Sequence, residues 1–175
     1  MGTQDLAVIT VVGDDRPGIV ASVSKALFEA GCNLEDVTST ILRGHFSMML
    51  MVRSPDGVED LGSRIEPALV AQGLSVTVRA VEEAAVDVAP PTHMVSVYGA
   101  DKPGIVYRVA EALSAAGANV TDLTSRVIGD PAAPVYALMI EVAVPSDRDA
   151  ETLLEGVRSE LEVDLSVHPI EADLL

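Results

Sequence analysis

The residues best suited to bind a small molecule occur in two loops of nearly the same sequence. The first loop is GDDRPG at residues 13–18, followed later by Asn33, and the second is GADKPG at residues 99–104, followed by Asn119. In each loop a glycine is expected to let the chain turn off a strand, and a Pro-Gly pair to begin a helix with the proline in its first turn. Free N–H groups at such a helix start hold carboxylates or phosphates. The candidate ligand-binding residues are therefore Gly13, Asp15, Arg16, Pro17, Gly18, Asn33, Gly99, Asp101, Lys102, Pro103, Gly104 and Asn119.

A purely structural interpretation of the same residues stays open. Asp15 would cap the helix that follows it, and Asn33 would adopt a left-handed turn conformation. Neither role requires a ligand.

The two loops belong to a longer internal repeat. At a constant offset of 86, residues 13–39 and 99–125 are identical at fifteen of twenty-seven positions. A repeat of this length predicts one small unit that folds twice. Each unit alone would bury only about 60% of its unfolded surface, so pairing of units through sheet edges or helix faces is expected, with the chain forming at least a homodimer.

Hydrophobic periodicity gives the elements of each unit. In the first half, strands are predicted over 6–12, 34–43, 46–53 and 75–81. Helices are predicted over 17–31, ending at Gly31 as the C′ glycine, and from Val58 to Leu69, where Pro67 should kink or split the helix. In the second half, strands are predicted over 93–99, 119–128, 135–144 and 163–170, helices over 103–117 and 147–161, and a loop over 129–134.

This order is that of an α+β fold of two ferredoxin-like βαββαβ units. Each unit should have an antiparallel four-stranded sheet with both helices on one face. The predicted domains are residues 1–82 and 93–175, joined by a linker at 83–92.

Composition excludes several classes of function. The 11 basic and 27 acidic residues give a net charge of −16, which argues against direct binding to nucleic acid or to an anionic membrane. The sequence shows neither a signal peptide nor an apolar run long enough to span a membrane, and we expect a soluble cytoplasmic protein.

His45, His93 and His168 lack metal-ligand spacing, and no cofactor motif or catalytic triad is present, so neither a metal nor a cofactor is expected. The single cysteine, Cys32, is interpreted as a buried structural thiol, and the stripe Met48–Met51 as core and interface packing.

The motifs resemble those of the ACT domain, a small-molecule-sensing module attached to many enzymes of amino-acid metabolism. DRPGIV, the helix ending in AGCN and the strand EDVTST carry the resemblance. Two such units without an attached enzyme are most similar to the glycine cleavage system transcriptional repressor family. ACT units in phosphoserine phosphatase and formyltetrahydrofolate deformylase share the motif.

The resemblance implies a binding mode. In the ACT units of phosphoglycerate dehydrogenase, serine lies across a unit–unit interface, held by the loop before the helix and by an Asn after it. These roles fall on Asp15 and Asn33, and on Asp101 and Asn119. The loop position is Asn in that family; an Asp attracts an ammonium group but repels a carboxylate, a repulsion that Arg16 or Lys102 could offset.

We therefore expect a non-catalytic regulatory protein that senses an amino acid or related metabolite and acts on a partner protein, including in transcriptional control of glycine metabolism. Three alternatives remain: a small ferredoxin-like hydrolase using the Asp15 loop for phosphate, a protein-binding ACT module without ligand, and an RNA-binding module. The hydrolase lacks a convincing base, and the RNA-binding module would have only Tyr98 on its first strands for stacking.

Overall fold

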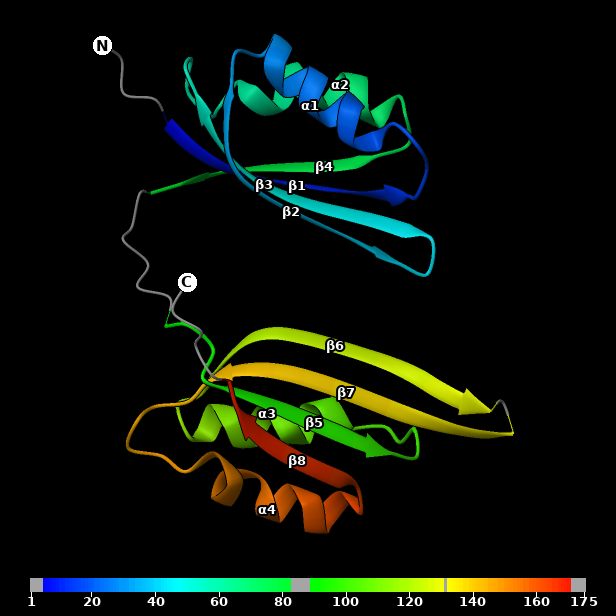
Figure 1. Ribbon diagram of the computed structural model, residues 1–175. Coiled ribbons are helices and arrows are strands. Elements are labelled where there is room, and N and C mark those ends of the chain that lie inside the picture. The colour runs from blue at the N-terminus through cyan, green and yellow to red at the C-terminus, as the bar shows by residue number, and fades with distance from the viewer. Residues whose placement is uncertain (1–4, 83–88, 131, 171–175) are drawn as a thin grey trace. The chain divides into compact units, whose positions relative to one another are not determined.

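The structure is a computed structural model that describes residues 5–82, 89–130 and 132–170. The chain divides into two compact units, residues 1–86 and 87–175. Each has the order βαββαβ, and Figure 1 labels the elements. Residues 83–88 of the predicted linker lie outside the described residues. Residue Thr92, at the end of the predicted linker, is already tied to the second sheet, because its N–H donates to the carbonyl of Val142 at 2.8 Å.

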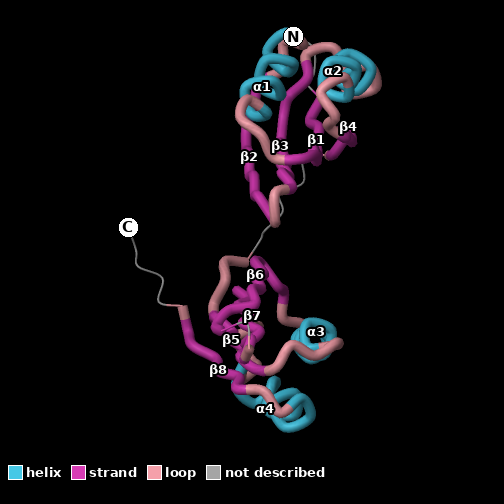
Figure 2. The backbone as a smooth tube through the Cα atoms, turned by 90° about the vertical axis from the view of Figure 1, so that its right-hand side faces the viewer, coloured by secondary structure: helices cyan, strands magenta, loops and turns pink. Residues whose placement is uncertain are grey.

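The first unit is a four-stranded antiparallel sheet with the strand order β2-β3-β1-β4. Its elements are β1 (Asp5–Asp14), α1 (Ile19–Glu29), β2 (Asn33–Leu42), β3 (His45–Ser54), α2 (Leu61–Val70) and β4 (Ser75–Val81). Both helices lie on the same face of the sheet (Figures 1 and 2). The predicted fold is therefore confirmed.

The second unit repeats this arrangement with the strand order β6-β7-β5-β8. Its elements are β5 (His93–Gly99), α3 (Ile105–Ala115), β6 (Asn119–Asp130), β7 (Ala133–Ala143), α4 (Ala150–Leu161) and β8 (Asp164–Pro169). The loop predicted at 129–134 is wrong for its described residues, because the β6–β7 hairpin continues through it and Gly129 pairs with Pro134. Residue 131 lies outside the described residues.

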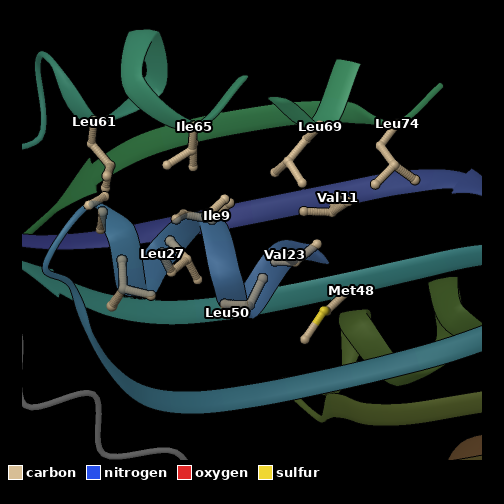
Figure 3. Close-up of a cluster of buried hydrophobic side chains, with 14 of the residues drawn as sticks. Ile9, Val11, Val23, Leu27, Met48, Leu50, Leu61, Ile65, Leu69 and Leu74 are labelled. Carbon is tan, nitrogen blue, oxygen red and sulfur yellow. The ribbon is translucent and has the colours of Figure 1, made fainter. Parts of the chain in front are cut away.

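The core of the first unit lies between the helices and the inner face of the sheet. Ile9 and Val11 alternate along β1 and are fully buried, and Leu61, Ile65 and Leu69 point toward them from α2 (Figure 3). β1 is a central strand of the sheet, and its alternate residues on the outer face are only half-buried or exposed. Val20, next to the buried Ile19 in α1, is 49% exposed.

Both first helices end as the sequence predicts. Gly31 and Gly117 have φ angles of 72° and 74° and follow the C-caps of α1 and α3. In α1 the N–H of Gly31 donates to Phe28 and that of Cys32 to Leu27, which is the Schellman pattern. Pro67 does not split α2, which runs without a break from Leu61 to Val70.

Candidate functional site

The loop between β1 and α1 begins later than the sequence predicts. β1 continues through Gly13 to Asp14, and α1 starts only at Ile19. Pro17 therefore precedes the helix instead of occupying its first turn. Gly18, with a φ of 95°, is the N-cap, a conformation that favours glycine because side chains with a Cβ are strained there.

Gly13 and Gly99 serve close packing and not a sharp turn. A Cβ built on Gly13 would lie 2.6 Å from Leu74 Cδ2, and one built on Gly99 would lie 2.9 Å from Val163 Cγ1. Neither glycine has a positive φ. Each allows the end of its strand to approach the chain that leads from the second helix of its unit into the last strand.

The N-terminus of α1 has no side-chain cap. The predicted capping role of Asp15 is therefore wrong: its backbone N–H donates to the carbonyl of Gly44 in the β2–β3 turn at 2.8 Å. Its carboxylate is exposed and forms no ion pair with any described residue. The second unit matches this arrangement, because Gly104 is the uncapped N-cap of α3 with a φ of 97°.

The cations of the two loops have different partners. The Arg16 guanidinium donates to the backbone carbonyl of Gln72, which leaves its positive charge without a carboxylate. Lys102 forms an ion pair with Glu162, with 3.6 Å between Nζ and the carboxylate oxygen. Only the first loop therefore keeps a cation whose charge no described carboxylate neutralises.

The first loop borders a shallow hollow with a volume of about 610 Å³. Asp15, Arg16 and Gly18 line one side of it. Val20 of α1 and Ile41 of β2 line the other, and both are about half exposed. The hollow exists because α1 does not cover β2, whose ten residues are all exposed.

Asn33 does not reach this hollow within its own unit. It lies at the first position of β2, opposite Arg53, whereas the loop of Asp15 lies at the end where Asp14 and Leu42 both meet His45. The nine steps along β2 span about 30 Å. Asn119 is likewise at the start of β6, opposite Ala143, while the end of β5 next to Asp101 lies opposite Tyr136. The structure thus separates each Asp from its predicted Asn.

Asn33 also lacks the left-handed conformation expected of it, because Arg43 and Glu162 are the non-glycine residues with positive φ in the described chain. Sequence reasoning missed Val20, Ser39, Ile41 and Phe46 as lining residues of the hollow. Their signal was available in the alternation Val37, Ser39, Ile41, which marks one face of an edge strand.

Other polar clusters do not form a site. His45 Nδ1 lies 3.3 Å from a carboxylate oxygen of Asp14, and both side chains are exposed. Within residues 5–82, 89–130 and 132–170, no group of three or more His, Cys, Asp or Glu side chains could hold a metal ion. Among these same residues, no helix is both long and apolar enough to cross a membrane.

Cys32 differs in part from its prediction, and the core part of the prediction for the methionine stripe is confirmed. Cys32 is only half-buried, and partial burial raises the pKa of its thiol above the ordinary value. Met48 is in the core, but Met49 is 50% exposed on the outer face of the sheet.

Comparison with known proteins gives the same result for both halves. Sequence profiles of the ACT domain match residues 5–80 in the first half and residues 93–159 in the second. A UPF0237 protein of Streptococcus mutans is 42% identical over 72 residues, which are 41% of this chain and 82% of that protein. Phosphoserine phosphatase SerB2 of Mycobacterium tuberculosis is 29% identical over 165 residues, covering 91% of this chain but 39% of the phosphatase.

Two solved structures match nearly the whole chain. A protein of unknown function from Galdieria sulphuraria superposes with a TM-score of 0.78 and 29% identity, covering 95% of this chain and 99% of that one. A proposed glycine cleavage system transcriptional repressor superposes with a TM-score of 0.69 and 23% identity, covering 97% and 99%. At that identity the second likeness concerns the fold alone.

Proposed function

Because the chain belongs to the ACT domain family, with one such domain in each half, we propose that it is a non-catalytic regulatory protein that senses an amino acid. The observation that carries the proposal is the hollow beside the uncapped start of α1, with the exposed carboxylate of Asp15 on its rim. An α-amino acid needs an anionic partner for its ammonium group and N–H donors for its carboxylate, and this place offers both.

In the proposed binding mode Asp15 accepts from the ammonium group and the first turn of α1 donates to the carboxylate. The guanidinium of Arg16, whose only described partner is a neutral carbonyl, offsets the repulsion between Asp15 and the ligand's carboxylate. The aliphatic side chains of Val20 and Ile41 would contact the apolar part of the ligand.

In this binding mode Asn33 reaches the site only from another copy of the chain. β2 is an edge strand with Leu34, Val37, Ile41 and Leu42 exposed, and such an edge is a template for pairing with another strand. If the β2 strands of two copies pair antiparallel, the start of one strand lies beside the end of the other. The 30 Å separation within a unit then becomes proximity between copies, and each Asp15 meets the partner's Asn33.

The regulatory effect is proposed to act on a partner protein. With 27 acidic against 11 basic residues, the chain is a poor ligand for DNA, so any transcriptional control, including that of glycine metabolism, would pass through another protein. The phosphatase activity in the name of one relative belongs to a protein of which this chain spans 39%.

The first test is calorimetry with each of the amino acids, on the wild type and on Asp15→Ala. Losing one charge-assisted hydrogen bond costs about 1.5–3 kcal/mol, so affinity should fall by roughly ten- to a hundredfold. Asp14→Ala is the matched control, because Asp14 is the neighbouring exposed carboxylate and does not line the hollow. Asp101→Ala reports whether the second unit binds as well. If the wild type binds no amino acid, the protein-binding ACT module without ligand becomes the better explanation.

A complementation experiment tests whether the site is shared between copies. Asp15→Ala and Asn33→Ala should each weaken binding in a pure dimer. When the two variants are mixed and allowed to exchange, each mixed dimer should regain one intact site, made of Asp15 from one chain and Asn33 from the other. Binding with half the wild-type stoichiometry in the mixed dimer is the expected result, and its absence would refute a shared site.

A further inference from the structure

The outer face of the second sheet, opposite α3 and α4, holds a second hollow, with a volume of about 420 Å³ (Figures 1 and 2 show the face that the helices leave open). It lies over β5, β6 and β7 and is separate from the loop sites. Its principal lining side chains are Met94, Tyr98, Asp122, Arg126, Met139 and Glu141.

The strand register sorts these side chains into an acidic end and a basic end. Glu141 of β7 lies opposite both Asp122 of β6 and Met94 of β5. Four residues further along β6, Arg126 lies opposite Ala137, which in turn lies opposite Tyr98. The two rows are about 13 Å apart along the strands.

The charges at the two ends are not neutralised by neighbours. Arg126, Asp122 and Glu141 take part in no ion pair among the described residues, whereas Lys102 and Arg108 of the same unit do. Between the two ends lies the row of Met139, which is 43% exposed. The hollow therefore presents two carboxylates, an apolar floor and a guanidinium in one line.

The first unit lacks this combination at the equivalent register positions. There the row of Asp36 holds Met51 in place of Glu141, and the row of Thr40, in place of Arg126, holds Ser47 and Val12. The corresponding hollow, lined by Asp36, Thr38 and apolar side chains, has a volume of only about 190 Å³. The charged line belongs to the second unit and is not a general consequence of the fold.

We propose that this hollow binds a linear zwitterion of about the length of a dipeptide. Its ammonium group pairs with Asp122 and Glu141, its carboxylate pairs with Arg126, and its middle lies on Met139. The rows lie about 13 Å apart along the backbone. Hydrogen bonds of about 3 Å at each end leave about 7 Å for a ligand between side chains that project straight from the sheet, which is the span of two extended residues. A free α-amino acid carries its ammonium and carboxylate groups on the same carbon atom and cannot reach both ends.

The class includes short peptides and ω-amino acids, and the experiment separates them. Calorimetry would use the full chain with dialanine and with 6-aminohexanoate, and with alanine, hexanoate and hexylamine as probes that lack the length or one charge. Binding of dialanine, 6-aminohexanoate or both, with at least tenfold weaker binding of the three controls, is expected, and the stronger of the two identifies the class. Failure of both long probes to bind would overturn the proposal.

Single substitutions test whether the long probes bind on this face of the sheet. Arg126→Gln and Glu141→Gln should each weaken the bound long probe by roughly ten- to a hundredfold, the loss expected for one charge-assisted pair. Arg79→Gln is the matched control, because Arg79 is an exposed arginine on the outer face of the first sheet, opposite Val8. An equal loss in Arg79→Gln, or no loss in Arg126→Gln, would overturn the proposal. Asp15→Ala should leave this binding unchanged, which distinguishes it from amino-acid sensing at the loop.

Discussion

Replacing Gly13 by alanine should destabilise the first unit through one identifiable contact. The new Cβ would lie 2.6 Å from Leu74 Cδ2 and 3.3 Å from the carbonyl oxygen of Gly73. Carbon atoms prefer separations of about 3.5–4.0 Å, so the overlap with Leu74 is about 1 Å. Leu74 is 2% exposed and has little room to move.

The expected cost follows from two opposing effects. Overpacking of a core costs about 1–3 kcal/mol. The alanine restricts the unfolded chain and returns about 0.4–1 kcal/mol. A net loss of about 1–2 kcal/mol lowers the midpoint of an 80-residue unit by about 4–16 °C, which calorimetry of the full chain would resolve as a shift of one transition.

A double-mutant cycle decides whether the contact with Leu74 is the cause. Leu74→Ala is itself destabilising, but it removes the atom that the new Cβ would meet. Gly13→Ala should then cost nothing or even stabilise, because the added methyl group fills part of the space. Gly18→Ala is the control: its Cβ would meet no atom within 4 Å, so Leu74→Ala should not change its cost. If Gly13→Ala costs the same with and without Leu74, the packing argument is wrong.

Three further outcomes are expected. Gly104→Ala should destabilise the second unit by about 1 kcal/mol in denaturant unfolding, because Gly104 has a φ of 97° and alanine is strained there; an unchanged midpoint would contradict this. Cys32 should react more slowly with Ellman's reagent at pH 8 in the folded than in the unfolded chain, because burial raises its pKa and lowers the thiolate fraction; equal rates would refute it. Hydrogen bonds from Thr152 and from the N–H of Glu151 lower the pKa of Asp149 at the start of α4, so its stabilising effect is present above the unfolded pKa of about 3.9 and is lost as pH falls through the folded value. Asp149→Ala should therefore lower the thermal midpoint more at pH 7 than at pH 2, and an equal difference at the two pH values would contradict this assignment.

The fold could be predicted from the sequence because its signals are local and occur twice. The period of α1, the glycine after it and the alternation of β3 each depend on neighbouring residues, and the repeat confirms them in the second unit. One error concerns the start of the first helix. Pro17 is a good first-turn residue, but Gly18 adopts a positive φ and delays the start of α1 to Ile19.

The candidate site was less predictable because it depends on strand direction. In sequence, Asn33 follows the helix that follows Asp15, but the sequence does not say at which end of the sheet each of them lies. β1 and β2 both run antiparallel to β3, so they run parallel to each other, and α1 returns the chain to the opposite end of the sheet before β2 begins. Residue types alone do not carry this information; the register does.

Each sheet has two edge strands, and those with the exposed large apolar side chains are β2 in the first unit and β6 in the second, so a chain has two edges of this kind for pairing. If β2 pairs with β2 alone, as in the proposed shared site, assembly stops at two copies. If β6 also pairs with β6, the outermost copies always keep a free edge and growth is open-ended. If β2 of one copy joins β6 of another and the contact is reciprocal, both edges are consumed at two copies and assembly stops. The two edges are not equivalent partners, because β2 has Thr40 and Leu42 where β6 has Arg126 and Ile128.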